Sequence, residues 1–308
     1  MKHNLTITLL LLVFFLLAQF IGLGLLYHYI DQEKSAAEGK TIYFALPVGE
    51  RPPLEEKSSY FPIMVAILIG TGLLFILLKF GLILVWRIWF LLAVTMSLTM
   101  VIGAYLKVEI AFVLSLFLGL WKIFKPNFWI QNLTELFIYG GLAVIFVPVF
   151  NLWSISILVV IIAIYDAYAV WKSKHMITLA LSQSKAKIFA GLYMPYRLTK
   201  AKKSKTISSS SKLSSSSSST TKSIKKVPSK IRTAVLGGGD IAFPLFFAGV
   251  VMKELGLWQS LVIPFFALAG LGFLLWYGDE NKFYPAMPFI GGSCLVGLGV
   301  VLLIQLVI

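Results

Sequence analysis

Long apolar stretches separated by short charged segments dominate the chain. A helix needs about 20 apolar residues to span the hydrocarbon core of a bilayer. The stretch from Leu5 to Tyr27 meets this length without a single charge. It is too long for the apolar part of a cleaved signal peptide, so the pattern predicts an uncleaved first span.

The same pattern predicts nine membrane-spanning helices and therefore an all-α, polytopic membrane protein. After the first, spans are expected at about Tyr60–Leu78, Ile88–Leu106, Val108–Trp121, two within Leu136–Trp171 separated near Asn151, Thr233–Met252, Leu255–Gly278 and Phe283–Ile308. Composition agrees, because 58% of the 308 residues are hydrophobic and only 13% are charged. Soluble domains carry about 25% charged residues.

Positive charge is concentrated in one part of the chain. Of the 27 Lys and Arg residues, 15 lie between Lys172 and Arg232. With nine spans, this segment shares a side with the N-terminus, and that side holds 21 Lys and Arg against six on the other. The bias predicts a cytoplasmic N-terminus and an external C-terminus in the cell membrane. A basic loop beside lipid headgroups explains the net charge of +14 without a nucleic-acid partner.

Three parts of the chain follow from these patterns. Residues 1–172 form an N-terminal bundle of six spans, residues 173–232 a basic, Ser-rich cytoplasmic loop, and residues 233–308 the last three spans. Within the loop, His175 to Tyr196 is expected to form an amphipathic helix on the inner leaflet. The run from Ser208 to Thr221 is nearly all Ser and Thr, which predicts a disordered tether.

Nearly every charge lies at a predicted span boundary, but Asp166 and Asp240 do not. An ionisable group inside a span is costly and usually marks function. Asp166 lies six residues before Lys172, or about 9 Å into the core, and Asp240 eight residues after Arg232, or roughly 12 Å deep. The two spans are antiparallel, so both carboxyl groups are expected at one level near the cytoplasmic face.

Two carboxyl groups that meet in a membrane can share one proton. The ionised group then takes a proton from water while the protonated one polarises an amide, which is the chemistry of an aspartic protease. Which group holds the proton is not decided by the sequence. The alternative is a carboxyl group satisfied by packing or by a neighbour such as Tyr165.

Two further segments break the regular helical pattern near these acids. Gly237-Gly238-Gly239 weakens a helix by about 1 kcal/mol per glycine relative to alanine and permits a close backbone approach, either by substrate or by another helix. The segment Pro285-Ala286-Met287-Pro288 opens the last span. Its prolines predict irregular backbone lining a cavity, or an ordinary proline-initiated helix.

Together these segments resemble the presenilin and signal peptide peptidase family of intramembrane aspartyl proteases. The family carries Tyr-Asp in span six, Gly-x-Gly-Asp in span seven and Pro-Ala-Leu at the start of span nine. The matching residues are Tyr165-Asp166, Gly237-Gly238-Gly239-Asp240 and Pro285-Ala286-Met287, with Met in place of Leu. Each motif alone is weak, but their order within a nine-span frame is specific.

The resemblance implies a hydrolase that cleaves membrane-spanning protein substrates after local unwinding, with Asp166 and Asp240 as its catalytic pair. Tyr165, Gly237 and Gly239 would shape the site, and Pro285, Ala286, Met287 and Pro288 would help to hold substrate. Strand addition of an extended substrate is expected near Pro285. The loop charges match the presenilin branch, which cuts substrates with external N-termini. We expect activity without obligate partner subunits, and the sequence leaves a homo-oligomer open.

Other classes of function are less consistent with the sequence. An ion-coupled transporter or cation leak channel also uses intramembrane carboxylates at a broken helix, and it is the main alternative. No His-Glu-x-x-His zinc motif occurs, and the single cysteine, Cys294, offers neither a disulfide nor a metal cluster. No cofactor or metal is therefore expected. No intramembrane His could activate Ser293, and a structural scaffold would leave the paired acids unexplained.

Overall fold

The computed structural model describes residues 5–172, 190–197, 231–278 and 284–307. The elements in these ranges are α1 (Leu5–His28), α2 (Gln32–Glu38), α3 (Tyr60–Lys79), α4 (Ile83–Ile102), α5 (Val108–Phe124), α6 (Phe128–Phe146), the short 3-10 helix η1 (Val147–Val149), α7 (Leu152–Trp171), β1 (Gly191–Arg197), β2 (Ile231–Gly237), α9 (Gly238–Leu255), α10 (Leu257–Ser260), α11 (Val262–Tyr277) and α12 (Met287–Val307).

Helices occupy all nine predicted positions in the described part of the chain. Seven of them, counting α6 with η1 and α10 with α11 as single helices, are long and apolar enough to cross a membrane. The other two are α5, which has 17 residues, and α9, which has 18 residues and includes Asp240, Lys253 and Glu254. The protein is thus a multi-pass membrane protein.

The predicted break near Asn151 is confirmed, and its cause is local. Asn151 is the N-cap of α7, and its side chain accepts a hydrogen bond from the Ser154 N–H at 2.8 Å. The Ser154 hydroxyl in turn lies 3.0 Å from the Asn151 N–H, which completes a capping box. These bonds satisfy backbone groups that a helix start otherwise leaves without partners.

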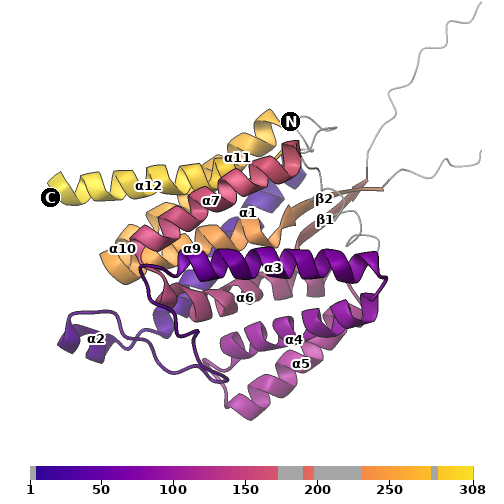
Figure 1. The fold of residues 1–308 in the computed structure, drawn as a ribbon, viewed down its shortest axis with the longest axis horizontal. Helices are drawn as coiled ribbons and strands as arrows, with labels where there is room; N and C mark the ends of the chain where they lie inside the picture. Colours follow the sequence, from indigo (N-terminus) through magenta and orange to yellow (C-terminus); the bar gives the residue numbers. More distant parts are fainter. Residues whose placement is uncertain (1–4, 173–189, 198–230, 279–283, 308) are drawn as a thin grey trace, which may run out of the picture.

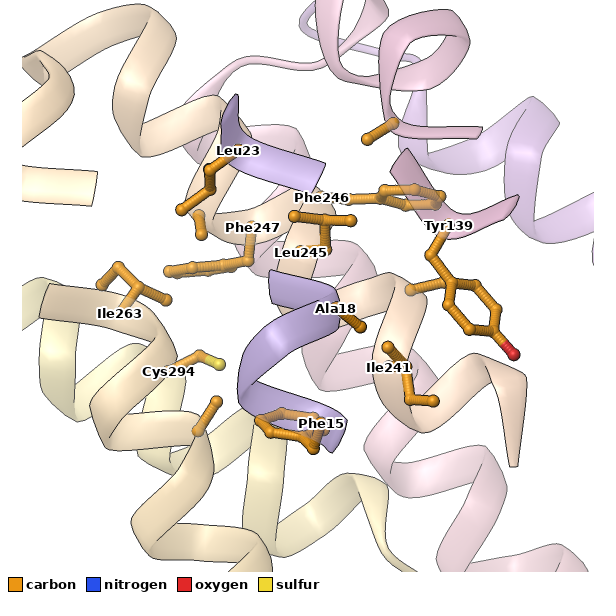
Figure 2. Close-up of a cluster of buried hydrophobic side chains, with 14 of the residues drawn as sticks. Phe15, Ala18, Leu23, Tyr139, Ile241, Leu245, Phe246, Phe247, Ile263 and Cys294 are labelled. Carbon is orange, nitrogen blue, oxygen red and sulfur yellow. The ribbon is translucent and has the colours of Figure 1, made fainter. Parts of the chain in front are cut away.

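Helix α1 runs through the centre of the bundle and packs against α6, α9 and α11 (Figure 1). Helices α4 and α5 pack side by side next to α6, and α7 lies between α9 and α12. The core between these elements holds fully buried side chains from several helices, among them Phe15, Leu245, Phe247 and Ile263 (Figure 2). Such dense packing stabilises membrane helices, for which lipid supplies little hydrophobic driving force.

Helix α3 is the least buried of the long helices. Only Leu77 is buried among its residues, and it has few neighbours in α4 and α7. A groove of about 350 Å³ separates it from α4. The rest of its surface is apolar and is therefore suited to lipid.

The two-stranded sheet was not predicted. Strands β1 and β2 pair antiparallel, with Gly191 opposite Gly237 and Tyr193 opposite Val235. The side chains of Leu192, Met194 and Ala234 are buried, as the two-residue period of a strand requires. The sheet lies at the end of the bundle where α1 begins and α9 starts (Figure 1).

This sheet corrects two boundaries. Span seven does not begin at Thr233, because residues 231–237 are extended and helix α9 starts only at Gly238. The helix expected over His175–Tyr196 is wrong for residues 191–196, which belong to β1. In both cases strand pairing outweighs local helix propensity, and Gly237–Gly239 favours the change from strand to helix. Residues 173–189 and the Ser208–Thr221 run lie outside the described residues.

Candidate active site

Asp166 lies in the last two turns of α7 and is buried, with 6% of its surface exposed. Its Oδ2 atom accepts a hydrogen bond from the Met287 N–H at 3.0 Å, and the N–H of Ala286 also interacts with the same carboxyl group. Met287 is the first residue of α12, so its N–H has no intrahelical partner. Asp166 therefore contacts the N-terminus of α12, the positive end of the helix dipole, where a negatively charged group is stabilised.

The segment Pro285–Pro288 is buried or half-buried at the start of α12. Pro285 and Met287 are buried, and Ala286 and Pro288 are half-buried. Pro288 lines an apolar groove of about 320 Å³ between α7 and α12, together with Ala163, Ala167, Gly291 and Gly292. The structure thus joins this segment to Asp166, although through main-chain atoms rather than through side chains.

Asp240 is the third residue of α9 and is half-buried. Its Oδ2 atom folds back toward the N-cap residue, since a side-chain carbon at Gly237 would lie 3.1 Å from it. The depth derived from a helix starting at Arg232 is wrong, because seven residues before α9 are extended. Asp240 instead lies at the junction of an edge strand and a helix.

The three glycines before Asp240 differ in what they permit. A side-chain carbon at Gly238 would lie 2.8 Å from the hydroxyl oxygen of Tyr139, whereas one at Gly239 would meet only the Phe243 ring, at 3.6 Å. Gly239 is exposed. The motif predicted roles for Gly237 and Gly239, but the tightest approach in the structure is at Gly238.

The helices that carry the two acids are neighbours. Helices α7 and α9 pack against each other, and α12 packs against both. Asp166 and Met287 are therefore in direct contact, and Asp240 is carried by the third member of the same group of helices. Tyr165 is half-buried beside Asp166 and interacts with it electrostatically.

A second set of buried polar groups escaped the sequence analysis. Glu135 of α6 is 1% exposed and Lys122 of α5 is 2% exposed, and they form an ion pair. Glu135 also accepts hydrogen bonds from the Tyr139 hydroxyl and from Gln131 Nε2, the latter at 3.1 Å. The statement that only two charges lie inside spans is thus wrong.

The error arose from where span five was expected to begin. It was predicted to start at about Leu136, but α6 begins at Phe128 and includes eight residues before that point. The available signal was the spacing of Gln131, Glu135 and Tyr139, which are four residues apart and share one face of a helix.

Strand β1 is closed on its outer edge by α6. Asn132 accepts a hydrogen bond from the Tyr193 N–H at 2.9 Å and donates one to the Tyr193 carbonyl at 2.9 Å. Gln131 Nε2 donates to the carbonyl of Gly191 at 3.2 Å. In the part of the chain that the structure describes, the sheet has two strands, so β2 forms its other edge.

No group of three or more His, Cys, Asp or Glu side chains suited to a metal occurs among the described residues. Cys294 is buried in the core, where Figure 2 shows it between helices. The Ser293 hydroxyl donates to the Phe289 carbonyl at 2.8 Å, which is an ordinary bond within a helix.

Comparison with known proteins shows the family and the fold. Residues 47–307 match the family model described as "Signal-peptide peptidase, presenilin aspartyl protease". Two solved structures of a presenilin family intramembrane aspartate protease, in space groups C222 and P2, are similar in fold. The first has a TM-score of 0.60 and 15% identity, covering 96% of this chain and 99% of that one. The second has a TM-score of 0.59 and 16% identity, covering 96% of each chain. No curated protein matches this sequence.

The fold and the family match define a polytopic intramembrane aspartyl protease. The family match extends over most of the chain, and the chain belongs to the signal peptide peptidase and presenilin aspartyl protease family. It is a hydrolase of membrane proteins, and nothing in the fold or the family favours the transporter alternative.

Proposed function

We propose that Asp166 and Asp240 are the catalytic pair of this protease and activate a water molecule between them. The observation that carries the proposal is the bond from the Met287 N–H to Asp166, which ties the acid of α7 to the start of α12. Helix α9, with Asp240 in its first turn, packs against both of these helices. Three segments far apart in the sequence therefore pack together, and two of them meet at Asp166.

The chemistry follows from two carboxyl groups in a partly dry site. Close approach prevents both from being ionised, so they hold one proton between them over a broad pH range. The ionised group acts as general base toward water, and the protonated group donates to the carbonyl oxygen or to the leaving nitrogen. No metal, cofactor or covalent intermediate is needed.

Substrate binds, in this proposal, as an extended segment along the outer edge of β2. The backbone N–H and carbonyl of Tyr193 point toward Asn132, so those of its neighbours Leu192 and Met194 point toward β2. The backbone N–H and carbonyl of Val235, which lies opposite Tyr193, therefore point away from β1. That edge leads within three residues to Asp240. Strand addition supplies main-chain hydrogen bonds to a peptide that has left its own helix. It was expected near Pro285, but the Met287 N–H there is bonded to Asp166.

We propose that the protein crosses the cell membrane nine times. Of the two helices that fall short in length or apolarity, α9 is mostly buried among other helices, whereas α5 packs on α4 with one face and exposes an apolar face suited to lipid. Helix α1 begins at the end that carries the sheet, and α12 finishes at the opposite end (Figure 1). Loop charge places the sheet end, with residues 173–232, in the cytoplasm.

The remaining proposals concern the three segments of the chain, its substrates and its partner subunits. Residues 1–172 carry Asp166, residues 173–232 form the cytoplasmic loop, and residues 233–308 carry Asp240 and the Pro285–Pro288 segment. The substrates are membrane-spanning proteins. The protease acts without obligate partner subunits, and its contacts with lipid, rather than with nucleic acid, account for the basic loop.

Purified protein in lipid vesicles with a single-span substrate tests the function. We expect peptide products from the wild type and none from Asp166→Asn or Asp240→Asn variants that elute and unfold like the wild type. Cleavage by either folded variant would reject the pair. Ion flux without proteolysis would favour the transporter instead.

A further inference from the structure

The polar stripe of α6, formed by Gln131, Asn132, Glu135 and Tyr139, has no assigned role in the reaction. Asn132 is 1% exposed, and its side-chain amide bonds twice to the backbone of one strand residue: its oxygen accepts from the Tyr193 N–H and its nitrogen donates to the Tyr193 carbonyl. The side chain therefore replaces a neighbouring strand. Burying a side-chain amide in a membrane protein costs free energy unless both its oxygen and its nitrogen are hydrogen-bonded, so these bonds fix the position of the Asn132 side chain.

The other members of the stripe act on the same short segment. Gln131 bonds both to the Gly191 carbonyl and to Glu135. The Tyr139 hydroxyl bonds to Glu135 and lies against Gly238, and Asp240 is close enough to interact with Tyr139 electrostatically. Figure 2 shows the Tyr139 ring at the edge of the core, with its hydroxyl pointing out of it.

These contacts converge on the junction between the sheet and Asp240. The Gly238 N–H donates to the Ala190 carbonyl at 3.1 Å, directly beside the Gly191–Gly237 pair. Helix α6 thus holds the strand from its closed edge and the first turn of α9 from the side. The outer edge of β2, on which a substrate strand would lie, is positioned by the same bonds.

We infer that Gln131 and Asn132 are positioning residues that determine which peptide bond of an extended substrate reaches the catalytic pair. The inference rests on the proposed function. Adjacent residues of a strand are about 3.3 Å apart along its axis. A sheet that shifts by this distance relative to α7 presents the next bond to Asp166. Loss of the amide contacts therefore spreads cleavage over neighbouring bonds instead of simply lowering the rate.

The experiment compares Asn132→Leu, which keeps the approximate shape of the side chain and removes its two bonds to Tyr193, and Gln131→Met with a control on the part of α6 that packs against α4. The control is Ile138→Ala, because Ile138 packs against Val94 and Leu98 of α4. Each protein is reconstituted with a single-span substrate, and all products are identified by mass spectrometry. Hydrogen exchange of β2 amides is measured on the same samples.

In Asn132→Leu we expect products cut one or two bonds from the main site to rise about tenfold relative to the main product, the factor for losing two hydrogen bonds. Exchange at Ala234 and Leu236, which Asn132 does not contact, should accelerate to a similar degree. Gln131→Met should act in the same direction, more weakly. Ile138→Ala should leave the product ratio unchanged even where its total rate falls.

Two results would overturn the inference. One is an unchanged product ratio in Asn132→Leu with accelerated exchange, which would make the amides structural only. The other is an unchanged exchange rate in β2, which would show that α6 does not hold the sheet. This measurement does not depend on enzymatic activity. A wild type that cleaves nothing would reject the proposed function itself and the register claim with it.

Discussion

At the scale of single residues, the site depends on contacts that main-chain atoms make. Asp166 is held by the N–H of Met287, and Asn132 by both backbone groups of Tyr193. Gly238 allows the Tyr139 oxygen to reach the backbone before Asp240. Side chains with special chemistry are few, and the backbone geometry around them does much of the positioning.

The adjacent glycines Gly238 and Gly239 should respond in opposite ways to alanine. A carbon 2.8 Å from the Tyr139 oxygen must displace a ring held by Glu135, so Gly238→Ala should lower the free energy of unfolding by about 1–3 kcal/mol. Gly239→Ala has room and should raise it by about 0.5–1 kcal/mol. Thermal unfolding in detergent measures both, and equal shifts would contradict the close approach at Gly238.

Residue identity alone allowed the two acids to be found, because an aspartate inside an apolar stretch is visible in the sequence. Glu135 and Lys122 were missed for the opposite reason. Each lies near other polar residues, so each looked like the end of a span. Their burial depends on the partner that each finds across α5 and α6, and such pairing is a property of the tertiary structure.

At the scale of elements, the ion pair between Lys122 and Glu135 joins α5 to α6 at a buried position. Lys122→Met removes one partner and leaves a buried carboxylate, which should destabilise the protein by about 3–5 kcal/mol. The double change Lys122→Met with Glu135→Gln should recover most of this loss. Chemical denaturation in detergent tests it. A double variant no more stable than the single one would show that the pair matters for more than charge compensation.

The start of α7 offers a second test, with a built-in control. Asn151→Ala removes the side-chain cap and should cost about 1 kcal/mol. Asn127 occupies the same position before α6 but makes no cap bond, so Asn127→Ala should cost little. The midpoints of thermal unfolding of the two variants should differ by about 1–2 °C. Similar losses in both would argue against the capping box.

Element positions were predictable because lipid demands long apolar helices, and each predicted span contains a helix. The sheet was not predictable, because β1 and β2 are separated by more than 30 residues and neither is stable without the other and without α6. Local propensity carries no information on such a pairing. For the same reason the first turn of α9, and with it Asp240, was placed too deep in a helix.

At the scale of the whole molecule, orientation is open to direct test. Cys294 is the single cysteine and is buried. In a Cys294→Ala background, Ser35→Cys should react with a membrane-impermeant maleimide in intact cells. Ser215→Cys should react only after the membrane is opened. The reverse pattern would place the basic loop outside and would exclude the proposed topology.

The bond between Asp166 and α12 has a consequence for how the third motif varies. The donor belongs to the peptide unit of residue 287, so any apolar side chain of suitable volume leaves it in place, and methionine can stand where relatives carry leucine. Proline is the exception, since it has no hydrogen to give. The contact at this position is thus made by main-chain chemistry that a comparison of side chains does not reveal.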